Sequence, residues 1–293
     1  MKARSIKILA SAMCLALLAT SALNVRAAAS EYMLNPASHP KLPLLAPEQG
    51  FNYSGDAYVY GDKMFYTTYR TNPGADENTN PTVTMQIFQA NADGSGAEKI
   101  ATEDLFGEDG KIALVTENYI LIYYGYATYE NAIMYDRRSG DITAAESYYT
   151  IGRTQKEYSS EKIPIKHVKE YYLMMKQHSD VSPQRIIVFN GKNAKSATVT
   201  GKGTDARILG KTIYYIAEKK NGFYLGSCDY KGGNNKILTK LDAPANCAYL
   251  GFKSLNKKGM SYRVMTEKGE KTYKYSFEDL WIRRSRETAQ LLS

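Results

Sequence analysis

The alternation of apolar and polar residues divides this chain into short strand-like runs that recur in the same order. Five runs match one another, and each is rich in aromatic, aliphatic and β-branched residues and is entered through a polar turn. They are GDKMFYTTYR from Gly61, ENYILIYYGY from Glu117, VKEYYLMMKQ from Val168, GKTIYYIAEK from Gly210 and KKGMSYRVMT from Lys257. This composition favours strands over helices, so the pattern predicts a repeated β unit.

A second strand is expected in each repeat, after a polar loop. The second runs begin at Thr84, Asn131, Gln184, Gly222 and Lys271, and four of the five are closed by a turn rich in Gly, Asn, Asp or Ser. Such turns need backbone with positive φ, which Gly adopts without steric cost and Asn or Asp tolerate. Shorter apolar runs before and after these pairs complete a meander of about four strands per repeat.

The length of the repeat points to one kind of all-β fold. Equivalent positions of the second strands are 47, 54, 39 and 47 residues apart, counted between Phe88, Tyr135, Phe189, Cys228 and Tyr275. A period of roughly 40 to 55 residues with four strands per repeat is typical of β-propeller blades. Residues 51–277 are therefore predicted to form a ring of about five four-stranded antiparallel blades. The alternative is a six-bladed ring with one degenerate blade.

The repeat also resembles a known kind of propeller. A strand ending in IYY or MFYT, a loop, a second strand, and then ADGSG or YKGGNN before a lysine-containing strand is similar to bacterial secreted repeats related to the low-density-lipoprotein-receptor (YWTD/TolB-like) propellers. The similarity is clearest in KTIYYIAEKKNGFYLGSCDYKGGNNKIL from Lys211, whereas RRSGD and FNGKN replace the Asp-Gly turn in the middle repeats. Those bacterial domains are mostly of unknown function, so the resemblance implies a fold and no activity.

The N-terminus has the three-part layout of a cleavable secretory signal peptide, assigned to residues 1–29. A basic segment before Ile8 is followed by an apolar run up to Leu23 and then by small residues up to Ala29. The apolar run is shorter than the roughly twenty apolar residues that span a bilayer, so cleavage is expected. A retained membrane anchor is the alternative. Cys14 lacks the preceding small residue of a lipoprotein signal. We therefore expect a protein secreted from a bacterium or held on its extracellular surface, without a stable membrane anchor.

Two further segments flank the predicted propeller. Residues 30–50 contain four prolines and are expected to form an extended arm that supplies a closing strand through KLPLL. Residues 278–293 are expected to form a short helix or a frayed tail.

The charge argues against nucleic acid as a partner. The sequence has 38 Lys and Arg against 30 Asp and Glu, and the loss of four basic residues with the signal peptide leaves 34 against 30. This excess is small and dispersed, whereas nucleic-acid binding needs a concentrated basic face.

The residues that carry most catalytic chemistry are sparse. A nucleophile–base site needs a Ser, Cys or Thr beside an oriented His, and the three histidines, His39, His167 and His178, accompany no G-x-S-x-G motif. None of them has a second His or Cys three or four residues away, as zinc sites require. We therefore assign no catalytic residue, no metal ligand and no cofactor.

The expected function is non-catalytic recognition of an extracellular glycan or a protein partner. The loops between the first two strands of each repeat differ most, and an asymmetric binding surface is expected there. Ligand contacts are predicted for the side chains at or beyond these strand ends, Tyr69, Arg70, Tyr126, Tyr129 and His178. The alternative is a glycan-active enzyme, a glycosidase with carboxylates on one propeller face. The two differ in whether acidic residues from three blades converge in a central pocket.

Two cysteines, Cys228 and Cys247, remain after removal of the signal peptide. A disulfide is chemically allowed in an exported protein, but the Cα atoms of the two cysteines must lie within about 7 Å of each other. The sequence leaves both the disulfide and two free thiols open.

The mature chain is predicted to begin at Ala28 or Ser30, because Ala27 and Ala29 are the small residues that follow the apolar run. Intact-mass measurement of secreted protein tests this. Protein that keeps its basic N-terminal segment in the membrane fraction would contradict it.

Overall fold

The computed structural model describes residues 31–34, 48–72, 82–107, 110–126, 129–153, 155–158, 160–176, 184–244, 247 and 249–278. The predicted signal peptide, the KLPLL segment, His178 and the C-terminal residues 279–293 lie outside these ranges. Tyr126 and Tyr129 are described by their backbone alone. Within the described ranges, no helix is long and apolar enough to cross a bilayer.

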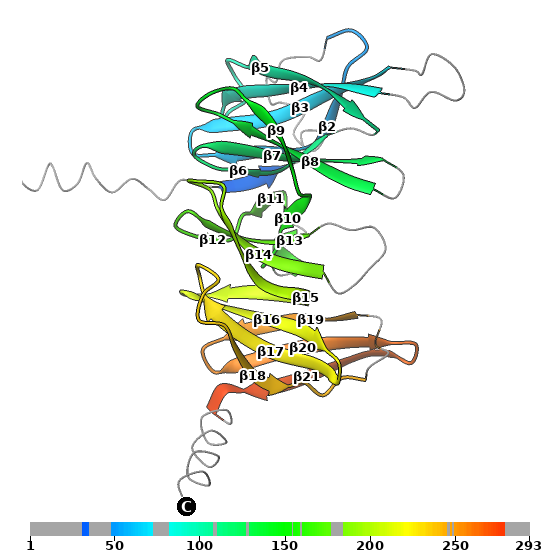
Figure 1. The fold of residues 1–293 in the computed structure, drawn as a ribbon, viewed down its shortest axis with the longest axis vertical. Helices are drawn as coiled ribbons and strands as arrows, with labels where there is room; N and C mark the ends of the chain where they lie inside the picture. The colour runs from blue at the N-terminus through cyan, green and yellow to red at the C-terminus, as the bar shows by residue number, and fades with distance from the viewer. Residues whose placement is uncertain are drawn as a thin grey trace, which may run out of the picture.

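Strands dominate the described residues and form five consecutive antiparallel meanders, or blades (Figure 1). The first blade contains β2 (Asn52–Tyr60), β3 (Lys63–Asn72), β4 (Thr82–Asn91) and β5 (Glu98–Phe106). The second contains β6 (Lys111–Val115), β7 (Tyr119–Tyr126), β8 (Tyr129–Asp136) and β9 (Ile142–Ala145). The third contains β10 (Tyr148–Thr150), β12 (His167–Val168), β13 (Tyr171–Lys176), β14 (Gln184–Asn190) and the start of β15 (Ser196–Leu209).

The remaining strands complete the array. The fourth blade contains the end of β15, β16 (Thr212–Lys219), β17 (Gly222–Asp229) and β18 (Lys236–Lys240). The fifth contains β19 (Tyr249–Asn256), β20 (Gly259–Thr266) and β21 (Gly269–Ser276). Two strands, β1 (Glu31–Leu34) and β11 (Lys162–Pro164), and one helical turn, α2 (Gln155–Tyr158), lie outside the repeats. The all-β fold of five propeller-type blades is thus confirmed, with three strands in the fifth blade.

The blades do not close into the predicted ring within the described residues. In Figure 1 the first blade and the fifth blade lie at opposite ends of the longest axis, and no strand pairing joins their sheets among the described residues. The N-terminal strand β1 pairs with β2 on one edge and with β11 on the other, so it extends the sheet of the first blade and joins no strand of the fifth.

One long strand joins the third and fourth blades. The first half of β15 pairs with β14 and the second half pairs with β16, with the change at Gly203. A Cβ atom at Gly203 would lie 2.3 Å from the end of the Ile186 side chain, so a larger residue here would force that side chain to move.

Hydrophobic cores lie between successive blades and hold many of the tyrosines. One cluster combines residues of the first three blades, including Tyr58 and Tyr172. A second contains Tyr215 and joins the third and fourth blades, and a third contains Tyr262 and joins the fourth and fifth. Packing is therefore the main role of these aromatic side chains.

The turns predicted at the ends of the second strands are confirmed in the middle blades. The side-chain oxygens of Asp136, Asn190 and Asp229 each accept the backbone N–H two residues later, at 2.9 Å. This local bond is the reason that Asp or Asn favours such turns, and it holds even where the Asp-Gly pair is absent.

The two cysteines are both free thiols, so the disulfide that the sequence left open is not formed. Cys228 is buried in the core of the third and fourth blades, whereas Cys247 packs against the core of the fourth and fifth. Burial raises the pKa of the Cys228 thiol to about 12, so this thiol stays protonated and unreactive at neutral pH.

A buried carboxylate links the fourth and fifth blades. Asp205 of β15 accepts the backbone N–H of Phe252 on β19 at 2.9 Å, and Arg207 Nη2 lies 3.3 Å from the same carboxylate oxygen. Burial raises the pKa of Asp205 to about 6, although Arg207 and backbone N–H groups oppose the rise.

We expect Asp205→Ala to lower the free energy of unfolding by about 1–3 kcal/mol, because it leaves the Phe252 N–H buried without an acceptor. Asp205→Asn keeps an acceptor and is the matched control. Since the folded-state pKa of about 6 exceeds the ordinary 3.8, the wild type gains stability as pH falls through 6 towards 3.8, and Asp205→Asn lacks this gain. Urea unfolding across this pH range measures both effects; equal pH profiles would contradict the second.

Candidate functional site

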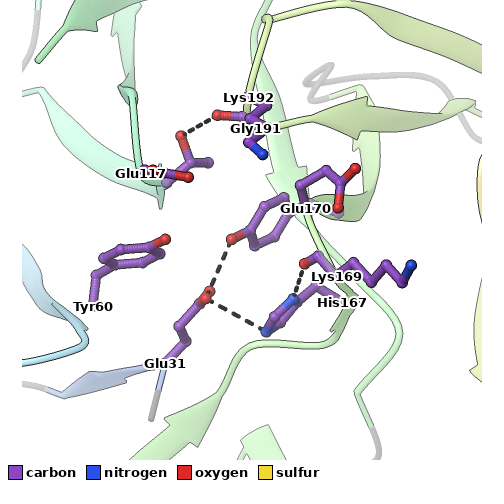
Figure 2. Close-up of a pocket in the computed structure, with 10 residues that line it drawn as sticks. Glu31, Tyr60, Glu117, His167, Lys169, Glu170, Gly191 and Lys192 are labelled. Carbon is purple, nitrogen blue, oxygen red and sulfur yellow. Dashed lines mark hydrogen bonds and ion pairs between the residues drawn. The ribbon is translucent and has the colours of Figure 1, made fainter. Parts of the chain in front are cut away.

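A cavity of about 340 Å³ lies among the first three blades (Figure 2). Its walls come from β1, the end of β2, the turn after β6, the β12–β13 hairpin and the turn after β14. This volume falls at the lower end of the roughly 300–1,000 Å³ typical of small-molecule sites. The cavity has room for one small ligand or one unit of a larger one.

The β12–β13 hairpin fixes the imidazole of His167. Lys169 in its tight turn has a φ of 56°, in the left-handed region that side-chain-bearing residues rarely adopt. Its carbonyl lies 2.6 Å from His167 Nδ1, and a carbonyl only accepts, so Nδ1 carries the hydrogen. The imidazole also stacks on the Tyr172 ring, with centroids 5.0 Å apart. Together these contacts direct Nε2 towards Glu31.

Glu31 is a buried carboxylate of the cavity wall, with a side chain only 6% exposed. Its Oε1 accepts a hydrogen bond from the Tyr172 hydroxyl at 3.2 Å and lies 3.5 Å from His167 Nε2. Its Oε2 has no hydrogen-bond partner among the described residues. Burial raises the pKa of Glu31, and His167 and the Tyr172 hydroxyl oppose the rise.

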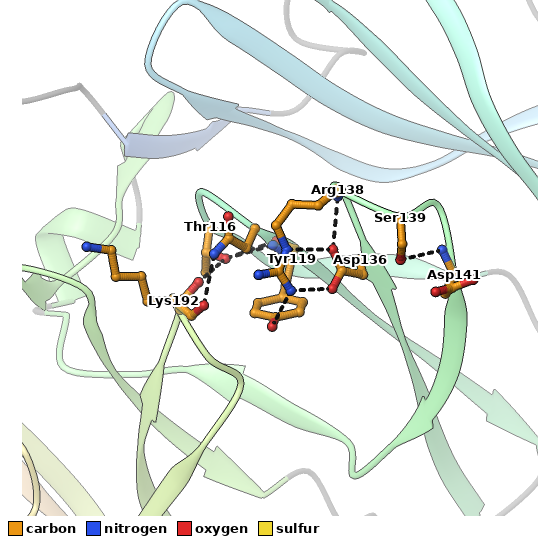
Figure 3. Close-up of polar contacts among 9 residues, drawn as sticks. Thr116, Tyr119, Asp136, Arg138, Ser139, Asp141 and Lys192 are labelled. Carbon is orange, nitrogen blue, oxygen red and sulfur yellow. Dashed lines mark hydrogen bonds and ion pairs between the residues drawn. The ribbon is translucent and has the colours of Figure 1, made fainter.

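The cavity wall opposite Glu31 is formed by the turns after β6 and β14, which are joined by hydrogen bonds from side chains to backbone carbonyls. Thr116 Oγ1 donates to the Gly191 carbonyl at 2.9 Å. Asn118 Nδ2 donates to the carbonyl of Lys192 at 2.8 Å (Figure 3). A Cβ at Gly191 would lie 2.7 Å from the Thr116 side chain and 2.9 Å from the Tyr172 ring. Two turns far apart in sequence are therefore locked at close range.

Further hydrogen bonds within the second blade hold the turn after β6 in place. Arg138 donates its backbone N–H to Asp136 Oδ1 at 2.9 Å and its Nη2 to the Tyr119 hydroxyl at 2.9 Å (Figure 3). The Arg138 guanidinium lowers the pKa of Asp136 to about 2, so this carboxylate stays charged. Tyr119 in turn donates its backbone N–H to Thr116 Oγ1 at 3.0 Å.

Acidic side chains from three parts of the fold line the cavity. Glu31 belongs to the sheet of the first blade, Glu117 to the second and Glu170 to the third. This convergence is the feature that distinguishes an enzyme from a binding module in the sequence-based interpretation. The lining includes no Ser or Cys nucleophile, and Thr116 is occupied by hydrogen bonds. Across the described part of the chain, no three His, Cys, Asp or Glu side chains gather closely enough to hold a metal ion.

The residues predicted to contact ligand are not brought together at this cavity. Arg70 lies over the Phe51 ring at 4.9 Å and bonds Asn72, at the far end of β3, and Tyr69 precedes it on that strand. The backbones of Tyr126 and Tyr129 are paired on either side of the β7–β8 turn, and their side chains are not among the described parts of the structure. His178 lies outside the described residues. Neither Tyr69 nor Arg70 lines the cavity.

The residues that sequence reasoning missed had weak signals. In the sequence, His167 is one of three scattered histidines, and Glu31 belongs to the segment expected to form an extended arm. The residue types gave no reason to pair positions 31 and 167. Only the β12–β13 hairpin could have been predicted from the sequence, because a short polar turn at Lys169 separates two apolar runs.

Comparison with known proteins identifies no relative. No family model matches the sequence, and no curated protein matches it. Among solved structures, an oligogalacturonate lyase in complex with manganese is 9% identical, with a TM-score of 0.41 over 86% of this chain and 73% of the lyase. The β-propeller domain of the Trilobed protease from Pyrococcus furiosus is 10% identical, with a TM-score of 0.31 over 84% of this chain and 95% of that domain.

A third structure, the acylaminoacyl peptidase of Pyrococcus horikoshii, is 11% identical with a TM-score of 0.39, and the match spans 38% of that enzyme. Likenesses this weak assign neither a family nor an activity, so the description of five blades rests on the strand pairing. The resemblance to low-density-lipoprotein-receptor type repeats is not confirmed by any match.

We expect Glu31→Gln to be at least as stable as the wild type at neutral pH. Glutamine keeps an acceptor for the Tyr172 hydroxyl and removes a buried charge. Because the folded-state pKa of Glu31 is raised above its ordinary 4.5, the wild type gains stability as pH falls through the raised pKa, and the advantage of the variant then disappears. Melting temperatures at several pH values measure this. A variant clearly less stable at neutral pH would show that the charge stabilises the fold.

Proposed function

We propose that this protein is a secreted, non-catalytic propeller-type module that binds an extracellular glycan at the cavity among its first three blades. One observation carries the proposal. The cavity is lined by a few convergent polar groups and tyrosine rings from three sheets, and its lining includes no Ser or Cys nucleophile. Polar groups set against aromatic faces are suited to a ligand with many hydroxyl groups.

The rigidity of the lining supports binding of a defined chemical group. The contact between Thr116 and the Gly191 carbonyl, together with the tight turn at Lys169, fixes the walls before any ligand arrives. A site that is already ordered loses less entropy on binding.

A glycan-active enzyme remains a second candidate, and one observation favours it. Glu31, Glu117 and Glu170 converge from three parts of the fold, and burial raises the pKa of Glu31, as in carboxyl groups that act as general acids. Hydrolysis of a glycan by purified protein, abolished by Glu31→Gln, would establish this candidate in place of the binding module.

A protein partner would be expected at a different place. The unequal loops with Tyr69, Arg70, Tyr126, Tyr129 and His178 stay the predicted surface for such a partner. Alanine substitutions at Tyr69 and Arg70 separate this surface from the cavity, since neither residue lines it.

We expect a glycan array to identify a ligand whose binding depends on the cavity. Tyr60→Phe removes a hydroxyl from the lining and Glu117→Gln replaces a charged carboxylate by an amide, both with little change of shape, so each should weaken binding by about 1–2 kcal/mol. Tyr69→Ala and Arg70→Ala should leave glycan affinity unchanged. If only Tyr69→Ala and Arg70→Ala lower the affinity, the glycan binds at the loops and not in the cavity. If the array yields no glycan ligand, the proposal is contradicted.

A further inference from the structure

We infer that the cavity recognises a primary ammonium group seated on Glu31, so that its ligand is a glycan containing amino sugars with a free amine. The inference rests on the proposed function and names the substrate class of the same site. Three observations lead to it: an unsatisfied carboxylate oxygen, the distribution of charge around it, and the acceptors that face it.

The unsatisfied oxygen is Glu31 Oε2. Both contacts of this carboxylate, from the Tyr172 hydroxyl and His167 Nε2, go to Oε1. Oε2 is buried without a hydrogen-bond partner among the described residues, on a side chain 6% exposed. A buried polar atom in this state is costly, and a donor supplied by a ligand removes the cost.

The charge of the lining favours a cation over an anion. Two further carboxylates, Glu117 and Glu170, line the cavity with Glu31. Lys169 and Lys192 also line the cavity, but Figure 2 shows the Lys169 side chain extending away from Glu31, and Figure 3 shows the Lys192 side chain extending away from Thr116. A ligand carboxylate or phosphate would therefore meet like charge.

The number of acceptors fits an ammonium group. An ammonium has three N–H donors, and the lining offers Glu31 Oε2 and the two carboxylate oxygens of Glu117 as acceptors (Figure 2). An acetylated amine has one N–H and no charge, and its carbonyl would compete with the carboxylates for donors. The site should therefore distinguish a free amine from an acetamide.

The test compares two oligosaccharides that differ only in acetylation. Binding of a fully deacetylated β-1,4-linked glucosamine oligomer and of its fully N-acetylated counterpart is measured by calorimetry at near-neutral pH. We expect the deacetylated oligomer to bind at least about tenfold more tightly, which corresponds to about 1.4 kcal/mol. Glu31→Gln should weaken its binding about ten- to a hundredfold, with the melting temperature as a check on folding. Glu161→Gln, at an exposed position near β11, makes the same charge change and should leave binding unaltered.

Each contrary result overturns a stated part. Equal affinity for both oligomers, or preference for the acetylated one, overturns the ammonium inference and leaves the glycan module standing. Failure of both oligomers while the array yields another cavity-dependent glycan has the same meaning. Failure of every glycan overturns the proposed function as well. Binding only of a peptide, through its amine and dependent on Glu31, overturns the assignment to a glycan.

Discussion

The pairing of β1 on both of its edges is the interaction on which the site depends. β1 is four residues long, yet it aligns Met33 with Tyr58 of β2 on one side and with Ile163 of β11 on the other. The Ile165 N–H extends this ladder by donating to the Glu31 carbonyl at 3.0 Å. A strand bonded on both edges has its backbone groups satisfied and is held far more firmly than an edge strand. That firmness keeps the Glu31 carboxylate in a place where it is poorly solvated.

Burial of the Glu31 carboxylate lowers the stability of the folded protein, and the strained backbone of the neighbouring β12–β13 turn lowers it further. The raised pKa of Glu31 means that its ionised form is disfavoured in the folded protein. Lys169 adopts a left-handed backbone that few residues tolerate, and it does so where its carbonyl orients His167. Backbone strain and unsatisfied polar atoms that coincide at one cavity are typical of functional sites. Elsewhere the same fold satisfies its buried carboxylate, as the Asp205 contacts with Phe252 and Arg207 show.

The repeats could be predicted because their signals are local. Alternating apolar residues and turn-forming Asp, Asn and Gly act over a few positions, so the five blades and turns such as Asp136 and Asp229 followed from the sequence. Ring closure and the role of β1 could not be predicted, because they depend on which distant edges pair. Glu31 and His167 are 136 positions apart in the chain, and neither residue type nor spacing links them. The contact exists only because β1 and β11 become neighbours.

The geometry of antiparallel blades separates the cavity from the unequal loops. In a meander, the connection before a strand and the connection after it lie at opposite ends of that strand. The cavity uses the turn before β7 and the turn before β13, whereas the loops that differ between repeats follow β7 and β13. One end of the blades therefore has turns braced by Thr116 and Gly191, and the other has connections of unequal length, with two residues between β7 and β8 and nine between β3 and β4. Since precise recognition of a small group needs rigid support, the braced end suits the proposed glycan site. The unequal connections stay the predicted surface for a protein partner, so the two hypotheses belong to opposite ends of the same blades.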